Sequence, residues 1–252
     1  MFEKEIKLYM FFDALGDTVR TGPILWHINR KRTEDVKNHI MDLLFMLRIL
    51  RNYLPQNLDF SLMEDYIICH DLPEVITGDI TKFEGVSDEE IAHVTCLAID
   101  YIHEFFSGTM NFKQLITNYE ARNDIEAKTV HMLDKIQSAI PFMKYQLEGC
   151  IDIDNTDIPY DLRNHPFIVE EVEKGHDLAD VFYFWHRKAI AITDEECLKY
   201  GITREYADEI IRVIASFFSE LYEAKKNNDL LVDYTDFPEE ATTHNRNIKR
   251  IC

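Results

Sequence analysis

The amino-acid sequence predicts an all-α fold. Gly and Pro are scarce, at 8 and 7 of 252 residues, so few positions would break a helix. The stretches between them are rich in Leu, Glu, Lys, Ala, Met and Arg, which favour helices, and their apolar residues recur at helical spacing. With 46% hydrophobic residues the chain can bury a sizeable core. A sandwich or a barrel is therefore disfavoured.

Five helices are predicted over the first 150 residues. Thr33 precedes acidic residues, and Ser87 precedes Asp-Glu-Glu, as expected at helix starts. Thr21-Gly22-Pro23 instead predicts that residues 17–31 form a loop, and Thr77-Gly78-Asp79 predicts a turn. The predicted helices cover approximately residues 2–16, 33–53, 62–71, 87–106 and 125–146.

The sequence also predicts three parts along the chain. Residues 1–149 form the helical core, and residues 150–226 form a helical extension packed on it. An acidic, turn-rich stretch opens this extension, and helices follow near residues 176–190 and 203–226. From residue 227 onward the periodicity is lost, so residues 227–252 are expected to be an extended or poorly ordered tail.

Charge argues against nucleic acid as a partner. The chain carries 46 acidic and 27 basic residues, a formal charge of −19, and this charge would repel a polyanionic backbone. Basic residues nevertheless crowd into one short segment, which suits a small phosphorylated ligand. On composition alone, a solvated basic loop explains the segment about as well. Its members are Arg20, Arg30, Lys31, Arg32 and Lys37.

The cysteines and the N-terminus indicate a cytoplasmic protein. Five cysteines without a Cys-x-x-Cys spacing point neither to a disulfide framework nor to a thiolate zinc site. The first residues lack the basic-then-apolar layout of a signal peptide, and charged residues interrupt the apolar runs. We therefore expect no contact with a membrane.

One His-Asp pair stands in a setting that favours metal binding. His70-Asp71 ends an apolar helix, whereas a second pair, His176-Asp177, does not. Neighbouring helical side chains diverge by about 100°, so this pair needs ligands from other helices to enclose an ion. His39 and Asp134 lie on two other predicted helices and are candidates for those ligands.

Three blocks of sequence resemble one known family. They are Glu34-Asp35-Val36-Lys37-Asn38-His39, then His70-Asp71-x-x-Glu74-x-x-x-Gly78-Asp79, then Tyr119-Glu120 followed by Glu126-Ala127-Lys128-x-Val130-x-x-Leu133-Asp134-Lys135. Their order and spacing are similar to those of the HD-domain phosphohydrolases of the nucleoside 5′-monophosphatase type. The resemblance covers roughly residues 5 to 147, and it implies an HD-domain helical bundle with additional C-terminal helices.

This resemblance also implies a ligand set and a reaction. His39, His70, Asp71 and Asp134 would hold manganese, cobalt or a related divalent ion. A nucleoside 5′-monophosphate would be hydrolysed to nucleoside and phosphate, with a metal-activated water as the attacking group. It further implies that Glu74 lies beside this water and Asp79 near the leaving group, and that the protein forms a homodimer.

The phosphate-binding segment departs from the family pattern. The family has an Arg followed shortly by a Trp, but here Pro23 follows Arg20-Thr21-Gly22 and Trp26 comes later. We expect Arg20 to bind the phosphate and Trp26 to lie near the sugar, with Arg30 and Arg32 as competing phosphate ligands.

Alternatives remain open at this point. The same metal core could serve a nucleotide pyrophosphohydrolase acting on nucleoside triphosphates or alarmones, and a protein without turnover could use it only to bind nucleotides. His176-Asp177 with Asp180 could form a second metal site, although we favour the start of a helix there. The aromatic run at residues 181–185 could stack on a base, but core packing or a dimer interface is the more common role.

Overall fold

The computed structural model describes residues 2–81, 85–151 and 165–231, and it confirms the all-α class. Apart from one isolated bridge between Val19 and Asp35, the regular structure in these ranges is helical. The helices are α1 Glu3–Asp13, α2 Thr21–Leu25, α3 Val36–Leu50, α4 Phe60–Cys69, α5 Glu74–Thr77, α6 Asp88–Phe105, α7 Phe112–Glu120, α8 Ile125–Leu147, α9 Pro166–Glu173, α10 Val181–Arg187, α11 Asp194–Tyr200 and α12 Arg204–Lys226, with 3₁₀ turns η1 Ala14–Asp17 and η4 Leu178–Asp180.

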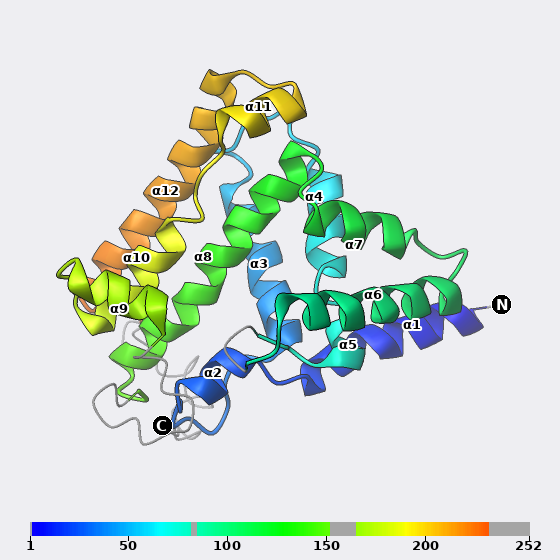
Figure 1. Cartoon of the computed structure of the whole chain (residues 1–252), viewed down its shortest axis with the longest axis horizontal. Helices are drawn as coiled ribbons and strands as arrows, with labels where there is room; N and C mark the ends of the chain where they lie inside the picture. Colours follow the sequence, from blue (N-terminus) through cyan, green and yellow to red (C-terminus); the bar gives the residue numbers. More distant parts are fainter. Residues whose placement is uncertain (1, 82–84, 152–164, 232–252) are drawn as a thin grey trace, which may run out of the picture.

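Helix α8 lies at the centre of the molecule (Figure 1) and packs against α3, α4, α7, α10 and α12. The side chain of Asp124 caps it by accepting a hydrogen bond from the Ala127 N–H, at 2.7 Å. Val130, Leu133 and Ile136 are fully buried along its length. α8 thus contacts helices that precede it in the chain and helices that follow it, and it forms the centre of the hydrophobic core.

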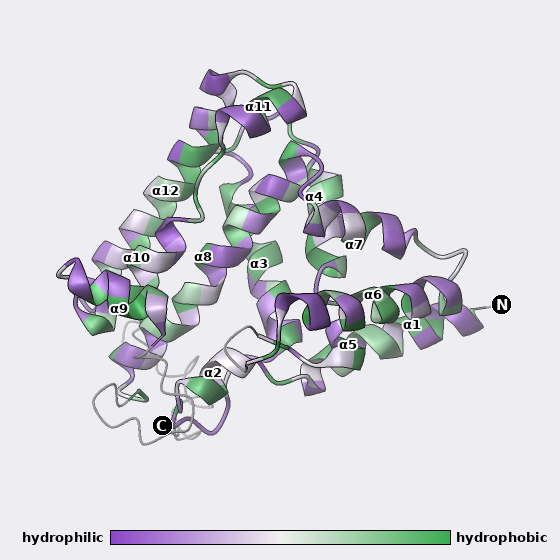
Figure 2. Cartoon of the chain, viewed as in Figure 1, coloured by the Kyte–Doolittle hydropathy of each residue, from purple (hydrophilic) through white to green (hydrophobic). Residues whose placement is uncertain are grey.

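Other helices start where the local chemistry dictates. α6 begins with the predicted signal, since Ser87 and Glu90 form a reciprocal capping box. The cap of α3 lies two residues later than predicted, because Asp35 rather than Thr33 supplies it, accepting a hydrogen bond from the Asn38 N–H at 2.8 Å. Green apolar positions recur along α3, α4 and α8 in Figure 2, and the buried residues of these helices belong to one hydrophobic core.

The expectation of a loop over residues 17–31 was wrong in part. Thr21–Leu25 forms the short helix α2, with Pro23 as its third residue. Proline is tolerated there because the N–H groups of the first turn have no partner within the helix, so none is lost. Pro23 therefore lies within a helix and does not break it.

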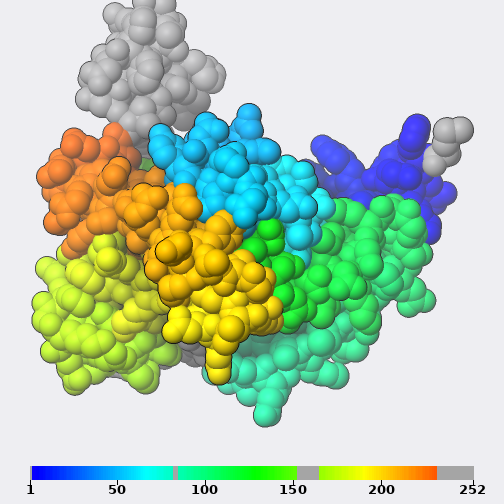
Figure 3. Space-filling view, turned by 90° about the horizontal axis from the view of Figure 1, so that it is seen from above, coloured from blue at the N-terminus to red at the C-terminus, as the bar shows by residue number. Residues whose placement is uncertain are grey.

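Besides α2, four helices, α5, α7, α9 and α11, were not expected from the sequence. The helix predicted over residues 176–190 is shorter, with η4 followed by α10, while the one predicted over 203–226 is confirmed as α12. α12 lies beside α3 on the face shown in Figure 3. The division at residues 149 and 226 stays a prediction, and most of the predicted tail lies outside the described residues.

Candidate metal centre

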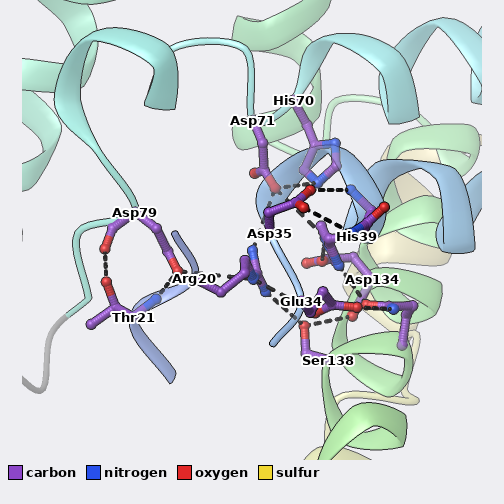
Figure 4. Close-up of polar contacts among 12 residues, drawn as sticks. Arg20, Thr21, Glu34, Asp35, His39, His70, Asp71, Asp79, Asp134 and Ser138 are labelled. Atoms are coloured by element: carbon purple, nitrogen blue, oxygen red, sulfur yellow. Dashed lines mark hydrogen bonds and ion pairs between the residues drawn. The ribbon is translucent and has the colours of Figure 1, made fainter. Parts of the chain in front are cut away.

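Three helices bring the four predicted ligands together (Figure 4). His39 lies in the first half of α3 and Asp134 in the middle of α8, while His70 is the C-cap residue of α4 and Asp71 follows it. Because α3 and α4 both pack on α8, side chains from all three helices converge at one place. His39, His70 and Asp134 are each at most 6% exposed.

The ligand atoms lie at short distances from one another. The donor atoms of His39, His70 and Asp71 lie within 4.8 Å of each other. Asp71 Oδ2 is 3.2 Å from His70 Nε2 and 3.6 Å from His39 Nε2. Asp134 Oδ1 joins this group at 3.0 Å from His39 Nε2. Two imidazoles and two carboxylates therefore share one small volume.

Both imidazoles present Nε2 to the cluster. His70 Nδ1 lies 2.8 Å from the carbonyl oxygen of Ile67, and His39 Nδ1 contacts Oε1 of Gln137. Both of these atoms only accept, so Nδ1 must carry the proton and Nε2 holds a lone pair. The two Nε2 atoms and Asp71 Oδ2 are buried without hydrogen-bond partners. Unpaired buried groups are costly, and a divalent cation would satisfy all three.

The electrostatics of the cluster agree with that fit. Burial alone would lower the pKa of His70, but the negative charge of Asp71, whose Oδ2 lies 3.2 Å from Nε2, prevails and raises this pKa to about 9. Burial opposes ionisation of Asp134, yet Lys135 and His39 hold its pKa well below the usual range. The carboxylates thus stay ionised and attract positive charge, whether from protons or from a bound cation.

A half-buried arginine, Arg20, lies beside the cluster. Nη1 of Arg20 lies 3.6 Å from Asp71 Oδ2, and its Nε lies 3.9 Å from Asp79 Oδ2 and from Glu34 Oε2. Burial opposes the charge of Arg20, but these carboxylates outweigh it and raise its pKa further. Its guanidinium is therefore a fixed positive charge next to the candidate ion site.

Glu74 begins α5 and borders a cleft of about 430 Å³, whose lining includes His70, Asp71 and Glu120. Its Oε2 is buried without a hydrogen-bond partner. Burial, together with the negative charge of Asp71 and Asp79, raises the pKa of Glu74 to about 10. A divalent cation nearby would lower this pKa, so Glu74 is suited to exchange a proton at the edge of the cluster.

Asp79 holds the start of α2. Its carboxylate accepts a hydrogen bond from the Thr21 N–H at 2.7 Å, and its carbonyl oxygen accepts from the Thr21 hydroxyl. With the Arg20 contact, these bonds tie the turn after α5 to the segment that carries the arginine. Asp79 thus contacts both Arg20 and the first residue of α2.

Comparison with known proteins identifies the family. The family model described as the HD domain matches residues 12–159, a range that includes all four residues of the cluster. The chain belongs to the HD domain family. A comparison with curated proteins found no significant match.

Solved structures share this HD-domain fold at low sequence identity. A conserved hypothetical protein from Pyrococcus furiosus has a TM-score of 0.51 and 18% identity, over 68% of this chain and 97% of its own. The protein PH0347 from Pyrococcus horikoshii has a TM-score of 0.53 and 19% identity, over 86% of this chain and 99% of its own. A predicted metal-dependent phosphohydrolase from Magnetospirillum magnetotacticum has a TM-score of 0.56 and 13% identity, over 91% of this chain and 95% of its own. At these identities the similarity establishes the fold.

Three predicted substrate-binding residues, Trp26, Arg30 and Arg32, lie apart from the four predicted metal ligands. Trp26 is 4% exposed and packs edge-on against Phe182, with ring centroids 4.7 Å apart. Arg30 pairs with Glu148 at 3.0 Å. Arg30 and Arg32 line a different cavity, of about 380 Å³, between α3, α8 and α12. Of the predicted phosphate ligands, only Arg20 contacts the cluster residues.

The C-terminal aromatic run mainly packs inside the HD-domain protein. Val181, Phe182 and Tyr183 are buried, and Tyr183 stacks on Tyr222 with centroids 3.9 Å apart. The favoured interpretation, core packing, is therefore confirmed for these three side chains, and it leaves no free face for a base.

Among the described residues, no helix combines the length and the apolarity that a membrane span needs.

Sequence reasoning missed Gln137, which contacts His39 directly. Gln137 lies three residues after Asp134 on α8, so both side chains project from the same side of the helix. In the sequence, the only signal is a polar residue on the apolar face of a predicted helix; its burial, at 2% exposed, is known only from the structure. Ser138 was also missed; its hydroxyl lies 3.4 Å from Nη2 of Arg20.

Proposed function

We propose that the chain is a metal-dependent phosphohydrolase that hydrolyses nucleoside 5′-monophosphates to nucleoside and phosphate. One observation carries the proposal: two buried Nε2 atoms and one carboxylate oxygen without hydrogen-bond partners converge with Asp134. These donors suit manganese, cobalt or a related divalent ion better than a soft, thiolate-binding one. Membership of the HD domain family supports the same reading.

His39, His70, Asp71 and Asp134 would hold the cation. When bound, it would polarise the phosphoryl group and make water a stronger nucleophile at neutral pH. The protein would supply the ligands, a buried site and fixed charges that need no reorganisation during the reaction.

Arg20 would bind the phosphate. Its guanidinium now faces the carboxylates of Asp71, Asp79 and Glu34 at 3.6 to 3.9 Å, longer than close ion pairs. It therefore retains the capacity to donate to phosphate oxygens. Asp79 would lie near the leaving group, and its contacts with Thr21 and Arg20 support a further role in positioning this arginine.

Glu74 would handle the proton. As water attacks phosphorus, one of its protons would pass to the Glu74 carboxylate. The phosphorus–oxygen ester bond would break, the alcohol oxygen of the nucleoside would take a proton from solvent, and Glu74 would then return its proton to solvent. The buried, unpaired Oε2 of Glu74 lies at the cleft, which suits this acid–base role. The cleft, at about 430 Å³, falls within the usual volume of small-molecule sites, roughly 300–1,000 Å³.

The test is phosphate release from a panel of ribo- and deoxyribonucleoside monophosphates. Metal-stripped protein is resupplied in turn with manganese, cobalt, magnesium or zinc, and nucleoside triphosphates are included. Metal-dependent release of phosphate from monophosphates is the expected result. Pyrophosphate release from triphosphates would overturn the monophosphatase proposal in favour of a pyrophosphohydrolase. Metal and nucleotide binding without turnover would indicate a binding protein.

A further inference from the structure

We propose that Glu34 and Gln137 form a relay that fixes the tautomer of His39 and so keeps its Nε2 available to a divalent cation. The inference rests on the proposed function, because the cation is the one that the cluster would hold. Both are positioning residues: they act through His39 and do not touch the ligand volume themselves.

The relay begins at Glu34, which is anchored from three directions. Its backbone N–H donates to the Tyr145 hydroxyl at 2.9 Å, and Arg20 Nε lies 3.9 Å from its Oε2. The other carboxylate oxygen, Oε1, accepts a hydrogen bond from Nε2 of Gln137 at 2.9 Å. The Glu34 side chain is 9% exposed. An ionised carboxylate only accepts hydrogen bonds, so the amino group of Gln137 must face it.

This orientation of the amide decides the state of His39. With its nitrogen toward Glu34, Gln137 turns its Oε1 to Nδ1 of His39. A carbonyl oxygen only accepts, so Nδ1 carries the proton. The ring then has its lone pair on Nε2, the atom 3.0 Å from Asp134 and 3.6 Å from Asp71. Glu34 therefore determines, through Gln137, which nitrogen of His39 faces the cluster.

A reversed amide would close the site to a cation. It would set the carbonyl oxygen of Gln137 against the carboxylate of Glu34 and leave two acceptors facing each other. Its amino group would face Nδ1 of His39 and require the lone pair there, which moves the ring proton to Nε2. Since Gln137 is 2% exposed, water offers little compensation for either group.

His70 shows why the relay serves His39 alone. The Nδ1 of His70 donates to the carbonyl oxygen of Ile67, in the last turn of its own helix, at 2.8 Å. A backbone carbonyl cannot reverse, so the tautomer of His70 is fixed locally. His39 has no such contact from α3, and its orientation depends on side chains from α8 and from the segment before α3.

The first test removes the acceptor. Gln137→Met keeps the length of the side chain but cannot accept from Nδ1, and Gln146→Met is the control, since Gln146 lies on the same helix and donates to the Ala179 carbonyl oxygen. Manganese and zinc affinities of metal-stripped protein are measured by competition with a chelator. Loss of the acceptor is expected to weaken affinity by about 10- to 100-fold, with the control unchanged. Affinity within about twofold of wild type would overturn the relay.

The second test exchanges the two groups. Gln137→Glu alone sets two carboxylates together and is expected to weaken cation affinity. Adding Glu34→Gln lets the amide at position 34 donate to the new carboxylate, which still accepts from Nδ1, so affinity should return toward wild type. A double variant no better than Gln137→Glu would contradict the relay, and this holds even where Gln137→Met fails to fold.

Nitrogen-15 NMR of the histidine rings reports the tautomer directly, with the His39 signals identified by their loss in His39→Ala. Nδ1–H is expected in wild type and in the double variant, and a mixture with Nε2–H in Gln137→Met. None of these readouts needs turnover. If wild type releases no phosphate but the variants change cation affinity and the His39 tautomer as expected, only the proposed function is refuted. If wild type releases phosphate but Gln137→Met leaves cation affinity and the tautomer unaltered, only the relay is refuted.

Discussion

The same dipeptide occurs in two regions of the molecule with different surroundings. His70-Asp71 lies between α4 and α5, where Nε2 of the histidine and Oδ2 of the aspartate are buried without hydrogen-bond partners. His176-Asp177 lies between α9 and α10. There, His176 Nδ1 is 3.0 Å from Glu171 Oε2, and its ring stacks on Phe184 with centroids 3.5 Å apart.

The two aspartates of the second region also have partners within the fold. Asp177 caps η4 by accepting from the Ala179 N–H at 3.1 Å, and Asp180 pairs with Lys225 at 2.6 Å. The possible second metal site is thus accounted for by capping and ion pairs. In the first region, by contrast, Nε2 of His39, Nε2 of His70 and Oδ2 of Asp71 are buried without hydrogen-bond partners, as expected of metal ligands and not of a stabilising network.

The largest expected difference is in turnover. Asp71→Ala removes a carboxylate that faces both histidines and should reduce metal-dependent phosphate release by roughly 10⁴-fold or more, because catalysis by the cation would be lost. Asp177→Ala removes only a cap, so it should cost stability of about 1 kcal/mol or less with turnover near wild type. Phosphate release rates measured side by side check this pair. Equal rates of phosphate release in Asp71→Ala and Asp177→Ala would contradict the claim that only the first region takes part in catalysis.

Glu74→Gln sharpens the contrast within the first region. It preserves shape but removes the proton acceptor, so turnover should fall by about 10²- to 10³-fold while cation content stays unchanged. Glu173→Gln, an exposed position of α9, is the matched control. The measurement pairs phosphate release with metal analysis. Undiminished turnover in Glu74→Gln would remove Glu74 from the mechanism.

Much of the first region could be predicted from sequence, and the reasons are local. His39, His70, Asp71 and Asp134 occur in motifs of fixed spacing on long, strongly periodic helices, and such helices are the readiest to recognise. The relay could not be predicted, because Gln137 acquires its role only when α3 packs on α8.

The missed helices have a similar cause. α9 and α11 have 8 and 7 residues, too short to be stable without tertiary packing. The placement of Trp26 likewise depends on α10, since Phe182 of that helix covers it. Contacts between distant parts of the chain decided these features, and local patterns carry little of that information.

Two arginines of the basic segment provide a smaller contrast. Arg20 contacts the cluster, whereas Arg30 pairs with Glu148 at 3.0 Å. Arg20→Ala should reduce kcat/KM by about 10- to 100-fold, the effect of losing a charge-assisted hydrogen bond to phosphate of about 1.5–3 kcal/mol. Arg30→Ala should change it less than threefold. Steady-state kinetics on the best monophosphate substrate measures both, and a larger loss in Arg30→Ala would transfer the phosphate-binding role to Arg30.

The smallest expected effect is on the stability of the second region. Burial opposes the charge of Glu171, but hydrogen bonds from Lys188 and Lys174 prevail and lower its pKa to about 2. Glu171→Gln should therefore reduce the free energy of unfolding by about 1–2 kcal/mol at neutral pH, where water also screens these lysines, with turnover retained.

The pH dependence of this effect has a defined sign. The pKa of Glu171 lies below its ordinary value of 4.5, so its stabilisation is complete above about pH 4.5 and declines as the pH falls toward 2. Urea unfolding of wild type and Glu171→Gln between pH 7 and 3 should show their difference narrowing in that window. A difference that grows toward low pH would contradict the ion-pair account.

Cation binding tests the central claim most directly, because it needs neither a substrate nor turnover. Metal-stripped wild type, His70→Ala and His176→Ala are titrated with manganese, and bound metal per chain is counted. The account predicts one ion per chain in wild type and in His176→Ala, with affinity at least about 100-fold weaker in His70→Ala. Equal affinity in wild type and His70→Ala, or loss of the ion in His176→Ala, would contradict it.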